Sequence, residues 1–350
     1  MQSWTVPSVV GIAIVLGAVA VTATLIVLLF PLLRRYALAR PNARSSHTIP
    51  TPQGGGIAVV AATLATLAGA VGWTGVVPWH DLQLLAILLG TTGLAAVGMI
   101  DDIRPIPPAP RLALQALAVG LVIAALPCDL RVLPLLPGWI ERVGLGLGLL
   151  WFVNLVNFMD GIDWMSVAEI VPVTAALGLL SALGAVPPLG GLAALALLGA
   201  MLGFAPFNRP RAKLFLGDVG SLPIGLVTGW LLIGLAGSGH LAAALLLPLY
   251  YLADATLTLL LRLRRRERVW EAHRSHFYQR ATTNGLSVGQ VIARVALVNM
   301  VLAGLAVTSA MAESQAVSVA ALCGGAVVVG VLLVGFARPR PAHDNARGIG

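Results

Sequence analysis

Long apolar segments recur along almost the whole chain and restrict it to one class of fold. Of its 350 residues, 58% are hydrophobic and 10% are charged, and the mean hydropathy is +0.92. Soluble domains carry about 25% charged residues, whereas about 20 consecutive apolar residues are enough to cross a bilayer as a helix. The sequence therefore predicts an all-α, polytopic membrane protein.

Eleven apolar segments can be delimited. They cover 9–33, 56–76, 82–100, 111–127, 143–159, 165–184, 188–206, 219–237, 240–261, 287–309 and 316–336. We expect the first to be a retained membrane helix, because no basic stretch precedes it as in a cleaved signal peptide. The pattern predicts one integral membrane domain over residues 1–337 with polar loops at one end, followed by a polar tail at 338–350.

The distribution of basic residues predicts the orientation. The formal charge of +8 would also suit a nucleic-acid-binding protein. With these eleven segments, however, 20 of the 22 Lys and Arg lie in connections on one side of the membrane, Arg131 and Arg142 being the exceptions. The positive-inside rule assigns that side to the cytoplasm. We therefore expect an outer N-terminus, a cytoplasmic C-terminus and no nucleic-acid partner.

Five aspartates fall on the predicted cytoplasmic side. They are Asp101, Asp102, Asp160, Asp163 and Asp218. Carboxylates held close together repel one another, and a hard divalent cation relieves this. Mg²⁺ takes only one or two protein carboxylates and completes its shell with phosphate oxygens and waters, so the cluster indicates a phosphate-bearing substrate. The outer acids, Asp81, Asp129, Glu141 and Glu313, are expected to be solvated surface charges.

Two other polar segments on this side favour anion binding. Lys213 is the only lysine of the chain and lies five residues before Asp218, where a helix is expected to begin. The segment lacks the Gly-Lys-Ser/Thr of a Walker A loop, so ATP hydrolysis is not indicated. His273 and His276 lie among arginines, which favours phosphate binding over metal binding. Asp254, expected to be buried, needs a partner from Arg or backbone groups.

These segments contain five motifs in order, and together they resemble the polyprenyl-phosphate N-acetylhexosamine-1-phosphate transferases of glycosyltransferase family 4. The motifs are RSxHxxPTPxGG at 44–55, DD at 101–102, NxxDGID at 157–163, FxGDxGS at 215–221 and HRSH at 273–276. Phospho-MurNAc-pentapeptide transferase and undecaprenyl-phosphate GlcNAc-1-phosphate transferase relatives belong to this family. The RSxH and HRSH forms look closest to members that initiate O-antigen synthesis.

The resemblance implies transfer of N-acetylhexosamine-1-phosphate, of a GlcNAc or deoxy-N-acetylhexosamine type, from a UDP-sugar to undecaprenyl phosphate with release of UMP. It implies a bacterial inner membrane enzyme that uses Mg²⁺, with Mn²⁺ as a second candidate and a homodimer left open. Asp218 would bind the metal, Asp101 or Asp102 would assist the lipid phosphate, and Asp160 and Asp163 would shape the nucleotide and metal environment. The implied substrate-binding residues are His47, Arg111, Asn157, Asn208, Lys213, Phe215, His273, Arg274 and His276.

One position departs from the family pattern. Family members commonly continue the third motif with glycine, whereas this chain has Trp164, which lacks the backbone freedom of glycine and bears on sugar selectivity. Two other readings stay open: a polytopic lipid or sugar transporter or flippase, and an inactive scaffold derived from the family. A transporter would concentrate its polar residues near the bilayer midplane, often within internal repeats, and neither pattern is evident in the sequence.

Overall fold

The computed structural model describes residues 8–39, 50–268, 273–312 and 314–339, and this part of the chain is almost entirely helical. The helices are α1 Ser8–Tyr36, α2 Gly55–Thr74, α3 Leu82–Ile103, α4 Pro108–Ala124, α5 Gly138–Met159, α6 Met165–Ala182, α7 Pro188–Asn208, α8 Asp218–Gly237, α9 Leu241–Leu246, α10 Leu249–Arg264, α11 Phe277–Thr283, α12 Val288–Met311 and α13 Gln315–Ala337. Two strands of two residues each, β1 Leu38–Ala39 and β2 Thr51–Pro52, pair antiparallel.

Nine of the described helices are long and apolar enough to cross a membrane: α1, α2, α3, α5, α6, α7, α8, α12 and α13. The shorter α4 has 17 residues and is also apolar. The predicted all-α, polytopic membrane fold is thus confirmed, and each of the eleven apolar segments coincides with helix. The fifth helix begins at Gly138, five residues before the predicted start at 143.

The prediction of one continuous helix over 240–261 is wrong. The segment divides into α9 and α10, and Pro248 lies between them. Proline has no N–H to donate and its ring clashes with the carbonyl one turn earlier, so α9 ends at Leu246 and α10 begins at Leu249. Apolar composition alone could not reveal this break, because the residues on both sides are equally compatible with a membrane span.

Helix α8 is the centre of the bundle. In its most apolar 18-residue window 89% of the residues are buried, against 22% in the windows of α1 and α13. It packs against α3, α5 and α2. Gly98 permits the approach of α3, because a Cβ there would lie 2.3 Å from the carbonyl oxygen of Asp218. The first turn of α8 is therefore clamped in place by its neighbours.

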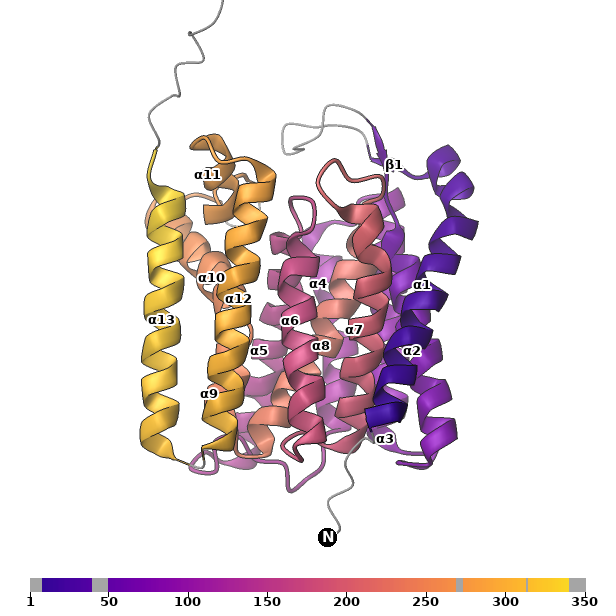
Figure 1. Cartoon of the computed structure of the whole chain (residues 1–350), viewed down its shortest axis with the longest axis vertical. Coiled ribbons are helices and arrows are strands. Elements are labelled where there is room, and N and C mark those ends of the chain that lie inside the picture. The colour runs from indigo at the N-terminus through magenta and orange to yellow at the C-terminus, as the bar shows by residue number, and fades with distance from the viewer. Residues whose placement is uncertain (1–7, 40–49, 269–272, 313, 340–350) are drawn as a thin grey trace, which may run out of the picture.

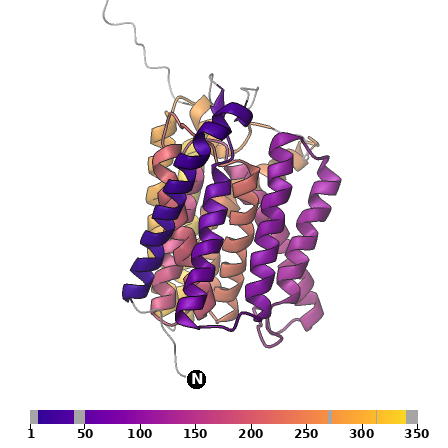
Figure 2. The same ribbon diagram turned by 90° about the vertical axis from the view of Figure 1, so that its right-hand side faces the viewer.

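The helices run roughly parallel to one another, and the polar connections gather at one end. Figure 1 shows β1 and α11 at the same end of the bundle, at the top of the view. Figure 2 shows indigo α1 and the purple helices that follow it side by side, in agreement with the contacts of α1 with α2, α2 with α3 and α3 with α4. The end that carries β1 and α11 is called the polar end below.

At the opposite end, the expectation that Glu141 is a solvated charge is wrong. Its side chain is buried and accepts hydrogen bonds from Arg131 Nε at 2.5 Å and from the N–H of Leu133 at 2.8 Å. The short chain between α4 and α5 folds back over the start of α5 and supplies these donors. Asp81 caps α3 by accepting from the N–H of Leu84 at 2.9 Å.

Candidate active site

Asp102 caps the central helix. Its Oδ1 accepts from the N–H of Asp218 at 3.0 Å and its Oδ2 from the N–H of Val219 at 3.1 Å. Helix N-termini have unpaired N–H groups and a positive dipole end, so a carboxylate is stabilised there. Because both oxygens of Asp102 are used in this way, the side chain fixes the place of Asp218 relative to α3.

Asp218 is the first residue of α8 and points toward α5 and α4. Its Oδ1 accepts from Asn157 Nδ2 at 2.8 Å, and the same amide nitrogen donates to Ser221 Oγ at 2.9 Å. Arg111 Nη1, from α4, lies 3.7 Å from Asp218 Oδ2. The carboxylate is 28% exposed, so it is held in position and is still accessible to a ligand.

Asp101 positions the arginine. Its Oδ2 lies 3.0 Å from Arg111 Nη1, and its Oδ1 accepts from the N–H of Ile106 at 2.6 Å. The adjacent aspartates thus have different contacts: Asp102 holds the start of α8, and Asp101 holds Arg111 between itself and Asp218. A cation beside a carboxylate at a phosphate site offers an anion a directed donor.

Asp160 lies in the turn after α5, where Ser166 Oγ donates to its Oδ1 at 2.5 Å. The pKa of Asp160 is raised to about 6, chiefly by burial and also by the negative charges of Asp102 and Asp163, while the hydrogen bond from Ser166 opposes these effects. A carboxyl group with such a pKa changes charge close to neutral pH, as groups in active sites commonly do.

Asp163 organises the loop after α7. Its Oδ2 accepts from the N–H groups of Arg211 at 2.9 Å and Ala212 at 3.0 Å, and the residue is 6% exposed. Asn208 acts in the same place: its Oδ1 accepts from the N–H of Trp164 at 2.8 Å and its Nδ2 donates to the carbonyl of Leu214 at 2.9 Å. These two side chains tie the loop at 209–217 to the turn at 160–164.

Trp164 adopts the backbone conformation for which glycine is suited. Its φ is 64°, in the left-handed region, where a residue with a Cβ is disfavoured by about 1–2 kcal/mol. The indole Nε1 donates to the carbonyl of Ala205 at 2.6 Å. The side chain thus anchors the turn to the end of α7, and this contact offsets part of the backbone strain.

A cavity of about 210 Å³ lies between these elements. Its lining includes seven of the residues predicted from the sequence, namely Asp102, Asn157, Asp160, Asp163, Asn208, Phe215 and Asp218. Asp101 and Arg111 adjoin it through their contacts with Asp218. Four segments that are far apart in the sequence therefore meet at one cavity at the polar end of the bundle.

Comparison with known proteins finds similarity to the family that the sequence motifs resemble. The profile of glycosyl transferase family 4 matches residues 84–236. The chain is 38% identical over 164 residues to a phospho-N-acetylmuramoyl-pentapeptide-transferase of Synechococcus sp. (strain RCC307), covering 41% of this chain and 45% of the relative. It is 25% identical over 282 residues, 75% of each protein, to a probable undecaprenyl-phosphate N-acetylglucosaminyl 1-phosphate transferase of Bacillus subtilis (strain 168).

The chain is therefore similar to glycosyl transferase family 4 over its central part, residues 84–236. A decaprenyl-phosphate N-acetylglucosaminephosphotransferase of Mycobacterium leprae (strain TN) is also similar, at 27% identity over 55% of this chain and 53% of the relative. The chain spans less than two thirds of the length of the Synechococcus and Mycobacterium relatives. The names of these three relatives do not mention O-antigen, so closeness to the members that initiate it stays a prediction.

The histidine loop at 273–276 lies beside the 210 Å³ cavity without lining it. His276 is buried, and its Nδ1 lies 3.3 Å from Asp254 Oδ1. Asp254 accepts from the N–H groups of Phe277 at 3.0 Å and Tyr278 at 3.1 Å. The hydroxyls of Tyr250 and Thr258, each at 3.3 Å, also donate to it. The rings of His273 and His276 are 4.8 Å apart. Arg274 belongs to the same segment, and His47 lies outside the described residues.

Tyr278 connects this loop to the cavity. Its hydroxyl donates to the carbonyl of Phe158 at 3.1 Å. Gly161 allows that approach, since a Cβ at this position would lie 2.0 Å from the Tyr278 oxygen. Sequence reasoning missed Tyr278, Ser166 and also Gln53, whose Nε2 donates to the carbonyl of Asp102 at 3.0 Å. Gln53 and Ser166 lie in or directly after recognised motifs, whereas nothing in the sequence links Tyr278 to Phe158.

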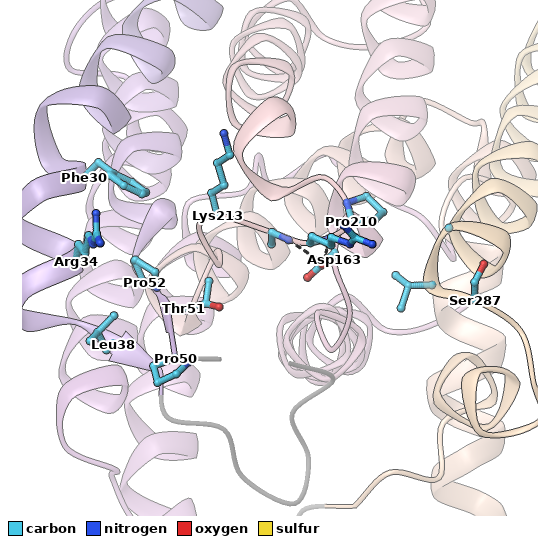
Figure 3. Close-up of a pocket in the computed structure, with 14 residues that line it drawn as sticks. Phe30, Arg34, Leu38, Pro50, Thr51, Pro52, Asp163, Pro210, Lys213 and Ser287 are labelled. Atoms are coloured by element: carbon cyan, nitrogen blue, oxygen red, sulfur yellow. Dashed lines mark hydrogen bonds between the residues drawn. The ribbon is translucent and has the colours of Figure 1, made fainter. Parts of the chain in front are cut away.

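Lys213 lies in a different cavity from Asp218, although the two residues are only five positions apart in the sequence. It does not line the 210 Å³ cavity but a larger, neighbouring one, together with Arg34 from α1 (Figure 3). Its backbone N–H donates to the carbonyl of Phe207 at 2.9 Å, and its side chain is exposed. Lys213 thus lies apart from Asp218 in the described structure, and its predicted role in holding phosphate or sugar stays a prediction.

Proposed function

We propose that this chain is a member of glycosyl transferase family 4 and a polyprenyl-phosphate sugar-1-phosphate transferase of the EC 2.7.8 type. In this reaction an oxygen of undecaprenyl phosphate attacks the sugar-linked phosphorus of a UDP-N-acetylhexosamine. A new phosphoanhydride bond forms, the bond to the uridylyl oxygen breaks, and UMP leaves. The observation that carries the proposal is the convergence of Asp218, Arg111, Asn157 and Asp160 at a cavity at the polar end of a membrane bundle.

Positioning and charge stabilisation are the chemistry that this arrangement supports. Phosphoryl transfer depends chiefly on them, since charge spreads over the phosphate oxygens. Arg111 Nη1 lies 3.7 Å from Asp218 Oδ2, and this arginine would hold the acceptor phosphate. Phe215, half-buried in the cavity lining, would pack on the uracil. A phosphate monoester is largely ionised above its second pKa of about 6, so a strong general base is not required.

The carboxylates fit a divalent cation. Within the described residues no three His, Cys, Asp or Glu side chains converge as a complete metal cage, but Mg²⁺ needs only one or two carboxylates when phosphates supply the rest. Asp101 and Asp102 are engaged with Arg111 and backbone N–H groups. Asp218 and Asp160 would therefore hold Mg²⁺, or Mn²⁺, which neutralises charge on the diphosphate when bound.

The geometry argues against a transporter. In secondary transporters the substrate residues lie near the bilayer midplane on broken helices, whereas here the cavity lies at one end, at the first turn of α8. The inactive scaffold is disfavoured because all five aspartates are retained and Trp164 fits its turn without blocking it.

Incubation of the purified protein with undecaprenyl phosphate, Mg²⁺ and a panel of UDP-N-acetylhexosamines, with detection of UMP, tests the proposal. We expect UMP release that depends on both the lipid and the donor. UMP release with GlcNAc or deoxy-N-acetylhexosamine donors would support a role in initiating O-antigen or a related lipid-linked glycan. Absence of UMP with every donor would refute the transferase and favour the scaffold or the transporter.

The setting follows from the same proposal. We place the site on the cytoplasmic face of a bacterial inner membrane, because the basic residues gather at the polar end. The proposal includes one membrane domain over residues 1–337 and a tail at 338–350. Residues 340–350 of this tail lie outside the described structure. A homodimer is compatible with the fold and is tested by light scattering in detergent.

A further inference from the structure

A second, larger cavity of about 980 Å³ lies at the polar end. It adjoins the cavity of about 210 Å³ at Asp218, which is called the catalytic cavity below. Figure 3 shows that its walls come from the end of α1, from β2 and from the loop after α7, with the start of α12 at the far side. These segments are separate in the sequence and enclose it from several directions. The volume lies in the range of small-molecule sites, roughly 300–1,000 Å³.

The two cavities are neighbours. Asp163 lines both of them, so one residue forms the boundary. The catalytic cavity, at about 210 Å³, is smaller than the roughly 300 Å³ at the lower end of such sites. A nucleotide sugar bound at Asp218 therefore needs additional space, and the larger cavity is the space that adjoins the catalytic carboxylates.

The larger cavity is basic. Three cationic side chains line it, Arg34, Arg211 and Lys213, against the single acid Asp163, which gives a formal charge of +2. Asp163 directs its Oδ2 at the N–H groups of Arg211 and Ala212. The three cations have no salt-bridge partner among the described residues. Ser287 and Gly289 add the positive dipole end of α12.

The rest of the lining is apolar except for Thr51. It consists of Phe30, Leu38, Pro50, Pro52, Pro210, Ala212 and Val288. A free inorganic anion would gain little from such a surface. The lining instead suits a negatively charged group attached to a larger body with apolar faces, such as a substituted sugar ring.

We infer that the larger cavity receives the glycosyl part of the nucleotide donor and selects donors whose sugar carries an acidic group, which Arg34, Arg211 and Lys213 bind. The inference rests on the proposed transferase function and extends it to specificity. It also gives the only lysine of the chain a role in donor selection, away from the diphosphate.

The test compares two donors that differ in one charge. The full-length protein is titrated with UDP-N-acetylglucosamine and with UDP-N-acetylglucosaminuronic acid, in which a carboxylate replaces the C6 hydroxymethyl group. Lys213→Gln and Arg34→Gln should each weaken binding of the acidic donor about 10-fold, the effect of losing one hydrogen bond to a charged group. Binding of the neutral donor should change less than about 3-fold.

Arg35→Gln is the matched control. Arg35 is the neighbour of Arg34 in the last turn of α1, is also exposed, and stacks over the ring of Tyr36 at 5.2 Å instead of lining the cavity. It should leave the affinity for both donors unchanged. Thermal melting of each variant checks that the fold is intact, which we expect since all three side chains are exposed.

The outcomes separate this inference from the proposed function. Equal weakening of both donors would show that the cations bind the diphosphate and would overturn the inference, as would no change with either donor. Vesicles rich in phosphatidylglycerol that displace the acidic donor from wild type, but not from Lys213→Gln, would assign the cavity to a lipid headgroup instead. If wild type binds neither donor and releases no UMP, the proposed function itself fails.

Discussion

The different contacts of Asp102 and Asp218 predict different losses for the same substitution. In Asp102→Asn one acceptor oxygen becomes an NH₂ group that faces a backbone N–H, so one of the two bonds to the start of α8 is lost. A hydrogen bond to a charged group contributes about 1.5–3 kcal/mol. If the whole loss falls on the transition state, the transfer rate drops about 10- to 100-fold.

Asp218→Asn should cost more, because this carboxylate faces the catalytic cavity beside Arg111. Loss of one group that stabilises the transition state typically lowers kcat by about 10²–10³-fold. Since a proposed metal contact is lost as well, we expect a decrease of at least about 10³-fold. The assay is Mg²⁺-dependent release of UMP by purified protein, with the Mg²⁺ concentration varied.

Asp81→Asn is the control for this pair. Asp81 also caps a helix, at the opposite end of α3, and Asn is as good a cap as Asp, so the rate should be unchanged. Equal and mild losses in Asp102→Asn and Asp218→Asn would refute the division of roles. A loss in Asp81→Asn as large as in Asp102→Asn would show that helix capping alone explains the effect.

Three further predictions follow from individual contacts. The pKa of Asp160 is raised to about 6, so its ionisation opposes folding and the stability of the protein should fall as pH rises from 3.8 to about 6. If Asp160 must be ionised to act, the transfer rate should rise with pH through about 6. In a pH–rate profile of Asp160→Asn this rise should be missing. Gly161→Ala should reduce the transfer activity at least 10-fold, because the new Cβ would lie 2.0 Å from the Tyr278 oxygen. The double variant Gly161→Ala/Tyr278→Phe should recover part of the lost activity. Gly144→Ala is the control and should leave the activity unchanged, because nothing lies within 4 Å of a Cβ at that position. Trp164→Gly should relieve about 1–2 kcal/mol of backbone strain but lose the hydrogen bond to Ala205 and the packing of the indole. The melting temperature in detergent should therefore fall by a few degrees. An unchanged preference among UDP-sugar donors would mean that Trp164 only packs.

The helices could be predicted from the sequence because each needs only a local property, an apolar run of sufficient length. Their ends were less accurate where polar residues are buried. Glu141 lies in the first turn of the fifth helix, which begins at Gly138, because Arg131 and the N–H of Leu133 satisfy its carboxylate, and such partners cannot be read from composition. The break at Pro248 was missed for a related reason, since the surrounding residues stay apolar and only the missing N–H ends the helix.

The members of the candidate site were predictable, whereas their contacts were not. Asp102 and Asp218 are 116 residues apart, and only the packing of α3 on α8 turns one into the cap of the other. Asp163 was expected to shape the nucleotide and metal environment, which stays a prediction, and the sequence did not show that its carboxylate also holds the loop after α7. Lys213, five residues before Asp218, lies in the neighbouring cavity because the backbone at 213–215 is held by Phe207 and Pro52.

The orientation in the membrane can be tested with a cysteine already in the chain. Cys128 is exposed in the connection between α4 and α5, at the end opposite the catalytic cavity. If the polar end is cytoplasmic, as the positive-inside rule predicts, a membrane-impermeant maleimide should label Cys128 in intact spheroplasts. Cys323→Ser serves as the background, because Cys323 is also exposed and lies within α13.

A reporter at the polar end completes this experiment. Thr283→Cys, in the same background with Cys128→Ser, places a thiol at the exposed last residue of α11, and it should be labelled only after the membrane is permeabilised. Labelling of Thr283→Cys in intact spheroplasts with protection of Cys128 would invert the orientation. The catalytic cavity would then open on the side opposite the cytoplasm. Because UDP-sugars are made in the cytoplasm, the proposed transfer reaction would lose its substrate. The topology experiment therefore tests the function as well as the fold.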